Sequence, residues 1–155
     1  MKRFGGSIPV AVASVLLVAA TITIRGDGQD STVNQQLAQA RAATAKYHDF
    51  NAAVADGYTE LGANPEEGGA IEFVNFGLID CTLDARQPEA LRYVDSGQGL
   101  RLIAVEYAIP MACQDDPPED FLPGVGEWEQ EAGVPVWMMP AFIWSGVSAD
   151  SDGLP

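Results

Sequence analysis

The stretch PEALRYVDSGQGLRLIAVEYAIP, residues 88–110, decides the fold of this 155-residue chain. It predicts two strands, 89–94 and 100–109, joined by a turn at 95–99, because Gly supplies positive φ while Asp and Ser bond their own backbone. The second strand alternates, with Leu102, Ala104 and Ala108 on one face and Ile103, Val105 and Ile109 on the other. A strand that is apolar on both faces is covered on both sides, so we expect it at the centre of a sheet.

One long helix is predicted before this hairpin. Thr32 and Gln35 have the spacing of a capping box, and apolar residues then recur every three or four positions. Gly57 is the natural C-terminal stop of that helix. The residues 62–69 that follow are rich in Gly, Asn and Pro, which indicates a loop.

Further apolar runs at 70–76 and 134–144 predict two more strands, and 127–131 a single helical turn. Pro140 removes a hydrogen-bond donor from the last strand, which implies an edge position or a bulge there. The expected fold is α+β: one long N-terminal helix packed on a small, mostly antiparallel sheet of about four strands.

The first residues of the chain have the anatomy of an export signal. Lys2 and Arg3 precede an uncharged apolar run at 8–24, which predicts a signal peptide or an uncleaved N-terminal membrane anchor over residues 1–24. The remainder divides into a polar tether at 25–31, a single domain at 32–145 and a loose acidic tail at 146–155. We therefore expect a protein that is secreted or held at the outer face of the cytoplasmic membrane.

The charge of the chain restricts its partners. It has 8 Lys and Arg residues against 22 Asp and Glu residues, a formal net charge of −14. Nucleic acid is excluded as a partner because its phosphates would be repelled. Contact with a membrane is expected only through the N-terminal segment. An acidic exterior instead suits solubility, cations or a basic partner, and its most acidic part is the proline-broken surface loop at 111–126.

Cys81 and Cys113 are the only cysteines, and an exported domain favours their pairing in an oxidising compartment. Both flank the central hairpin in sequence, so a disulfide between them would hold the acidic loop against the edge of the core. The alternative is a pair of free thiols, if the two Cα atoms lie too far apart to be bridged.

Glu106 is the most informative single residue, because it is a carboxylate inside the strand expected to be buried. A buried carboxylate must be paired or protonated. One interpretation is an ion pair, with Lys46 or Arg101 as partner; in the simplest register Arg92 lies opposite Leu102, too far along the sheet. The other interpretation is a general base or ligand anchor that faces a cavity.

His48 and Glu72 are the other candidates for chemistry. His48 is the only histidine, so the usual nitrogen and sulfur ligands of zinc are lacking, and we expect it at the margin of the helix–sheet interface. Glu72 could form a carboxylate pair with Glu106 if their strands are neighbours. Since the usual zinc ligands are lacking, we expect no metal site. We also expect no cofactor, because the sequence contains no phosphate-binding loop or dinucleotide fingerprint, and it has no nucleophile elbow.

Aromatic residues gather in the last third of the chain. Trp137, Phe142 and Trp144 belong to the last predicted strand, and Tyr47 lies on the apolar stripe of the helix. Most such residues form core. The functional alternative is an apolar pocket between the last strand and the helix, where a small ligand could bind.

Several segments together resemble a family of small exported bacterial α+β domains of unknown function. The matching residues are ATAKYHD at 43–49, ADGY at 55–58, FVN at 73–75, PEALRY at 88–93, LRLIAVEY at 100–107 and a terminal strand that ends at Trp144. In the family pattern, histidines stand where this chain has Glu72 and Pro140. The resemblance therefore implies the fold and export, and argues against metal chemistry here.

Two functions follow from these observations. The first is an exported, non-catalytic domain that binds a small ligand or a protein partner in a helix–sheet cleft. The alternative is a small extracytoplasmic enzyme that uses Glu106 with His48 or Glu72 as acid and base or as cation ligands. Convergence of these three side chains within about 5 Å around an open cavity would favour the enzyme.

Overall fold

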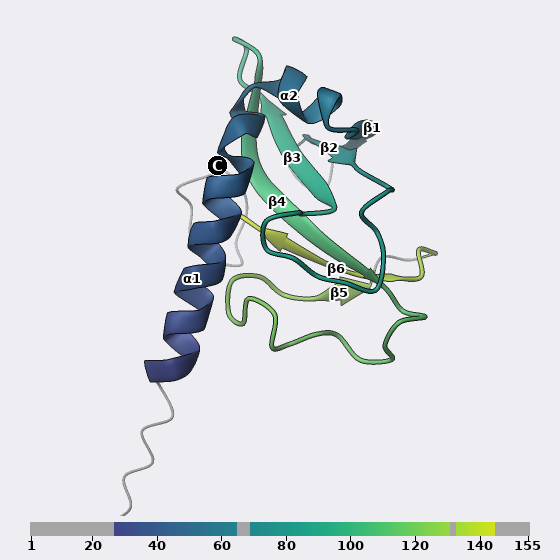
Figure 1. Cartoon of the computed structure of the whole chain (residues 1–155). Helices are drawn as coiled ribbons and strands as arrows, with labels where there is room; N and C mark the ends of the chain where they lie inside the picture. The colour runs from purple at the N-terminus through teal and green to yellow at the C-terminus, as the bar shows by residue number, and fades with distance from the viewer. Residues whose placement is uncertain (1–26, 65–68, 131–132, 145–155) are drawn as a thin grey trace, which may run out of the picture.

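The computed structural model describes residues 27–64, 69–130 and 133–144, which form an α+β domain (Figure 1). Its helical elements are α1 (Asp27–Thr44), the 3-10 helix η1 (Ala45–His48) and α2 (Phe50–Ala55). Its strands are β1 (Thr59–Asn64), β2 (Ala70–Val74), β3 (Ala90–Asp95), β4 (Leu100–Pro110), β5 (Glu129–Gln130) and β6 (Val136–Ala141). They form one six-stranded sheet in the order β1-β2-β3-β4-β6-β5, and every neighbouring pair is antiparallel.

The prediction of one long helix is wrong in its extent. The helix begins at Asp27, inside the predicted tether and before the predicted cap Thr32, and α1 ends at Thr44 after 18 residues. Thr44 is fully buried, and its hydroxyl donates to the carbonyl of Ala40 at 2.7 Å. Asp49 then takes an extended conformation (φ −86°, ψ 102°) and its side chain accepts from an N–H of α2, so a new helix starts there.

Gly57 ends α2 as predicted. Its φ is +94°, and its N–H donates to the carbonyl of Val54 at 3.1 Å. The N–H of Tyr58 donates to the carbonyl of Ala53 at the same distance. These two bonds are the Schellman arrangement, which satisfies the last carbonyls of the helix and turns the chain into β1.

The sheet has two strands more than the sequence indicated. β1 includes Gly62, which pairs with Glu72, while Glu60 pairs with Phe73, so Leu61 between them is the extra residue of a bulge. β5 has only two residues and lies where a helical turn was predicted. The antiparallel arrangement itself is confirmed.

The central hairpin is confirmed, but its register is not the simple one. Asp95 lies opposite Leu100, and the N–H of Ser96 donates to the carbonyl of Gly99 at 3.1 Å across the turn. Further along, Arg92 lies opposite Ala104 and Tyr93 opposite Leu102, so Ile103 is an extra residue of β4. Such a bulge reverses the alternation of side chains along the strand.

The bulge corrects the predicted faces of β4. Leu102, Val105 and Tyr107 all belong to the core beneath the helices, while Ile103 and Ala104 belong to a smaller cluster on the other face. The prediction that Leu102 shares a face with Ala104 was wrong. Both faces of β4 are nevertheless buried, as a central strand requires.

Aromatic rings fill the interface between the helices and the sheet. Phe50 lies 4.8 Å from Phe73 and 5.8 Å from Tyr93, ring centroid to ring centroid, and both pairs are edge-to-face. The buried hydroxyl of Tyr93 donates to the carbonyl of Tyr47 at 2.8 Å, and that of Tyr58 donates to the carbonyl of Pro88 at 2.6 Å. This layer is therefore packed core.

Pro140 lies on β6, between β4 and the short edge strand β5, at a position that β5 does not pair with. β6 pairs with β4 along its whole length without a register shift, whereas β5 covers only Trp137 and Met138. On the β5 side no described strand pairs with Pro140, which is a local edge of the kind that tolerates proline. None of the described helices is long and apolar enough to cross a membrane. The predicted leader, residues 1–24, and the predicted tail at 146–155 lie outside the described residues.

Candidate functional site

Glu106 is buried in an ion pair with Arg92. Its side chain retains 1% of its exposure, and the Nε and Nη2 of Arg92 donate to its two carboxylate oxygens at 2.8 and 3.1 Å. The bulge at Ile103 makes this contact possible, because it places Arg92 opposite Ala104 and therefore diagonal to Glu106. The prediction that Arg92 lies out of reach was wrong for that reason.

The partners predicted for Glu106 lie elsewhere. Lys46 forms an ion pair with Asp56, and Arg101 is exposed on β4. The two parallel bonds from Arg92 occupy both carboxylate oxygens of Glu106, which is the strong bidentate form of such pairs. A carboxylate held in this way stabilises the local arrangement of β3 and β4 and is poorly placed to accept a proton from a substrate.

Glu72 lies directly opposite Arg92 on β2. Because β3 separates β2 from β4, the strands of Glu72 and Glu106 are not neighbours, and the condition for a carboxylate pair is not met. The three charged residues lie side by side across three strands, with the guanidinium in the middle. Alternation places all three on the face opposite the helices, since Phe73, Tyr93 and the neighbours of Glu106 belong to the helix-side core.

His48 lies on the other side of the sheet. It is exposed at the end of η1, and its ring centroid is 4.5 Å from that of Trp144 in an edge-to-face contact. The indole N–H of Trp144 donates to the hydroxyl of Thr44 at 3.1 Å. The sheet therefore separates His48 from Glu106 and Glu72, and the three candidate residues do not converge.

The four aromatic residues predicted to bind a ligand are distributed over different surroundings. Tyr47 is in the helix-side core and donates to Asp56 at 3.0 Å, while Trp144 packs against the end of the helical layer. Phe142 packs against the small cluster on the opposite face. Trp137 pairs with β5 near the edge of the sheet. The structure brings His48 and Trp144 together, but it does not gather the four aromatic rings around one hollow of the described chain.

Glu89 is a buried carboxyl group that was not among the candidates predicted from the sequence. It retains 1% exposure, and its Oε2 accepts the backbone N–H of Ala108 at 3.0 Å. Burial raises its pKa to about 8, and the nearby charges of Asp80 and Asp84 act in the same direction. Its position at the start of an apolar strand, directly after Pro88, was the available signal. Its surroundings are core, so its perturbed pKa is explained by packing.

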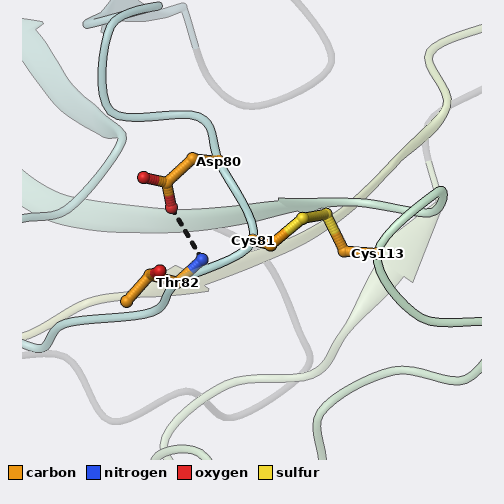
Figure 2. The surroundings of a disulfide bond; sticks show 4 residues. All are labelled: Asp80, Cys81, Thr82 and Cys113. Atoms are coloured by element: carbon orange, nitrogen blue, oxygen red, sulfur yellow. Dashed lines mark hydrogen bonds between the residues drawn. A yellow bond between two sulfur atoms is a disulfide. The ribbon is translucent and has the colours of Figure 1, made fainter.

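The predicted disulfide is confirmed. Cys81 and Cys113 are joined with their Cα atoms 5.4 Å apart, within the range that the bond requires (Figure 2). Asp80, beside Cys81, accepts the N–H of Thr82 at 2.6 Å and forms a local turn. The bond ties the connection between β2 and β3 to the beginning of the long connection that follows β4.

That long connection, residues 111–128, carries two hollows of the described surface. Figure 1 shows it curving along the β5–β6 side of the sheet. An open concavity lies along residues 114–120. Beside it is a groove of about 380 Å³, lined by Pro117, Glu119, Phe121, Leu122, Pro123, Gly124, Gly126, Glu127 and Trp128. We call this second hollow the loop groove.

The loop groove is built on the core. The ring of Phe121 packs 4.9 Å from the buried ring of Tyr107 and 6.4 Å from that of Trp128, centroid to centroid. Leu122 is fully buried and adopts a positive φ of 48°, which is uncommon for a side chain of this kind. Gly126 packs so closely on β6 that a Cβ atom there would overlap the carbonyl oxygen of Pro140.

Within the described residues, no group of three or more His, Cys, Asp or Glu side chains is placed to hold a metal ion. Comparison of the chain with family models, with curated proteins and with solved structures finds no match.

Proposed function

We propose that this chain is an exported, non-catalytic domain that binds a protein partner through the loop at residues 111–128. The observation that carries the proposal is the loop groove, a hollow held in shape from both sides. The disulfide anchors the beginning of the loop, and the contact of Phe121 with Tyr107 anchors its middle. Binding residues commonly lie on loops that a rigid scaffold positions.

In this proposal the binding surface is the loop groove and not the helix–sheet cleft that the sequence suggested. The layer between helices and sheet is filled by edge-to-face aromatic contacts, among them Tyr47 with Tyr58 at 5.2 Å between centroids. A ligand would have to displace packed core to enter there, at a cost of several kcal/mol for each large side chain removed. The loop groove is already open.

The enzymatic alternative is less well supported. It requires Glu106 to act together with His48 or Glu72, but the sheet separates His48 from both carboxylates and Arg92 lies between Glu72 and Glu106. General acid–base catalysis needs the acting groups within hydrogen-bond reach of one reacting atom. No observation on the described residues favours that arrangement.

Export is the second part of the proposal. The disulfide supports it, since such bonds persist mainly in oxidising compartments. The basic residues and apolar run at the start of the sequence support it independently.

Site-specific photo-crosslinking in the native host tests both parts. A photoreactive phenylalanine is placed at Asp120 or Glu129, exposed groove positions next to the lining residues Phe121 and Trp128, and at Asn34 or Thr59 as exposed control positions on α1 and β1. We expect a discrete protein adduct in the exported fraction from the groove positions and none from the controls. Absence of an adduct at both groove positions would overturn the binding proposal. Recovery of the protein only from the cytoplasm, with its N-terminal Met1 region intact, would overturn export.

A further inference from the structure

The loop groove is lined by apolar and aromatic residues together with acidic ones. Phe121, Leu122, Pro123 and Trp128 supply the apolar surface, and Glu119 and Glu127 contribute carboxylates. Such a combination is typical of sites that accept the aliphatic stem of a long side chain together with its charged end. At about 380 Å³ the hollow is at the small end for ligand sites, so it suits part of an extended segment and not a folded surface.

The charge of this region is uncompensated. The chain has no Lys, Arg or His after Arg101, so the whole loop is without a cation of its own. The ion pairs Lys46–Asp56, Arg86–Asp84 and Arg92–Glu106 all lie outside the loop. In the described part of the chain, neither Glu119 nor Glu127 has an ion-pair partner. Electrostatic complementarity therefore calls for a partner that brings the positive charge.

The groove is formed before any partner arrives. Leu122 lines it with a strained positive φ that its complete burial holds in place, and the N–H of Val125 donates to the carbonyl of Leu122 at 3.1 Å. Gly126 is fixed against β6, where no side chain fits. Because the loop is ordered in advance, binding of a partner does not have to include the free-energy cost of ordering the loop.

From these observations we infer that the loop groove binds an arginine side chain of an extended, basic segment of a partner protein. This inference rests on the proposed function and names the chemistry of its partner. The guanidinium stacks on the ring of Trp128, while Glu119 and Glu127 accept its N–H groups. Arginine fits better than lysine because its planar fork both stacks on aromatic rings and bonds carboxylates in pairs.

The test uses the full exported chain and two blocked peptides, one of alternating glycine and arginine and one of alternating glycine and lysine. The indole N–H resonances of Trp128, Trp137 and Trp144 are followed by NMR during titration. We expect the arginine peptide to shift the resonance of Trp128 and leave that of Trp144 unchanged. The lysine peptide should bind several-fold more weakly, since an ammonium group does not form the paired contacts.

Two variants with equal charge separate the groove from general attraction. Glu119→Gln combined with Glu127→Gln removes the groove carboxylates. Asp115→Asn combined with Asp116→Asn removes the same charge from the neighbouring concavity. We expect the two groove substitutions to weaken binding of the arginine peptide by about tenfold or more, because hydrogen bonds to charged groups are among the strongest. The two substitutions at Asp115 and Asp116 should weaken it by about twofold or less. The amide spectrum of each variant confirms its fold, and Glu119→Gln alone serves if the double variant unfolds.

Equal weakening by the two variants would overturn the inference, because it would mean attraction to diffuse acidic charge. A Trp128 resonance that does not move with saturating arginine peptide would overturn it as well. The proposed function fails separately: if photo-crosslinks still form at Asp120 or Glu129 while the arginine peptide does not bind, a partner of other chemistry uses the groove. If neither is observed, both proposals fall.

Discussion

Replacing Glu89 with Gln is expected to make the domain more stable at high pH and to leave it unchanged at low pH. Burial raises the pKa of Glu89 from 4.5 to about 8, and its Oε2 accepts the N–H of Ala108. Below pH 4.5 the carboxyl group is protonated in both the folded and the unfolded chain. As the pH rises from there, the unfolded chain releases this proton and the folded chain retains it, so the folded state loses stability.

The size of the effect follows from the two pKa values. Each pKa unit between the folded and unfolded states corresponds to about 1.4 kcal/mol. The loss is therefore about 3 kcal/mol at neutral pH and about 5 kcal/mol above pH 8, where both states are ionised and the loss is complete. A glutamine stays neutral, and its amide oxygen can accept the same N–H of Ala108. It therefore avoids the loss.

Urea denaturation of the oxidised protein at several pH values measures the difference. The unfolding free energy of the Glu89→Gln variant minus that of the wild type should be near zero at about pH 4 and should rise to a plateau above about pH 8. Glu60→Gln, on the exposed edge strand β1, is the control and should follow the wild type at every pH. Parallel curves for wild type and Glu89→Gln would refute the reasoning.

Three further outcomes are expected. Glu106→Gln should lower the unfolding free energy by about 3 kcal/mol, because it leaves Arg92 buried without its full charge partner; a loss as small as that of Glu60→Gln in the same urea titration would contradict the ion pair. Gly126→Ala should destabilise the domain by about 1 to 3 kcal/mol, since its Cβ would overlap the backbone of Pro140, and an unchanged melting temperature would count against this packing. Reduction of the disulfide should lower the unfolding free energy by about 3 to 4 kcal/mol in a comparison of oxidised and reduced protein. Two alkylatable thiols in protein recovered from outside the cytoplasm would contradict the bond itself.

Local sequence signals predicted the elements that depend on local chemistry. The glycines and Ser96 specified the reversal between β3 and β4, and Gly57 specified the end of α2. The pairing of Cys81 with Cys113 followed from their number and their positions around the hairpin. The α+β class followed from the change between helical and strand periodicity.

Tertiary packing decided what the sequence could not. The extra residue Ile103 follows no local rule, yet it reverses the faces of β4 and brings Arg92 to Glu106. The break after Thr44 lies in an alanine-rich segment with high helix propensity, and burial of Tyr47 overrides that propensity. β5 is too short to leave a pattern and exists because β6 offers it an edge.

The candidate site shows the same division. Burial of Glu106 was predictable from its apolar strand, but its partner depended on a register shift that no pattern reports. The position of Glu89 at the start of an apolar strand was a signal of burial, but its enclosure comes from segments distant in sequence, among them the strand of Ala108. The loop groove was equally hidden, since its shape depends on contacts of Phe121 and Gly126 with strands β4 and β6.

The way in which the acidic loop is held to the body of the protein has a consequence for binding. Its anchors are covalent and apolar: the disulfide, the edge-to-face contact of Phe121 with Tyr107, and the burial of Leu122. None of these contacts uses a charge, so salt at moderate concentration leaves them intact. The same salt screens the attraction between exposed carboxylates and positive charges that lie more than about 10 Å away. The carboxylates of the loop are thereby left to act outward. Salt should therefore weaken the proposed binding of a basic partner much more than it lowers the unfolding free energy of the domain. Binding would depend on charge, whereas the scaffold that holds the loop would not.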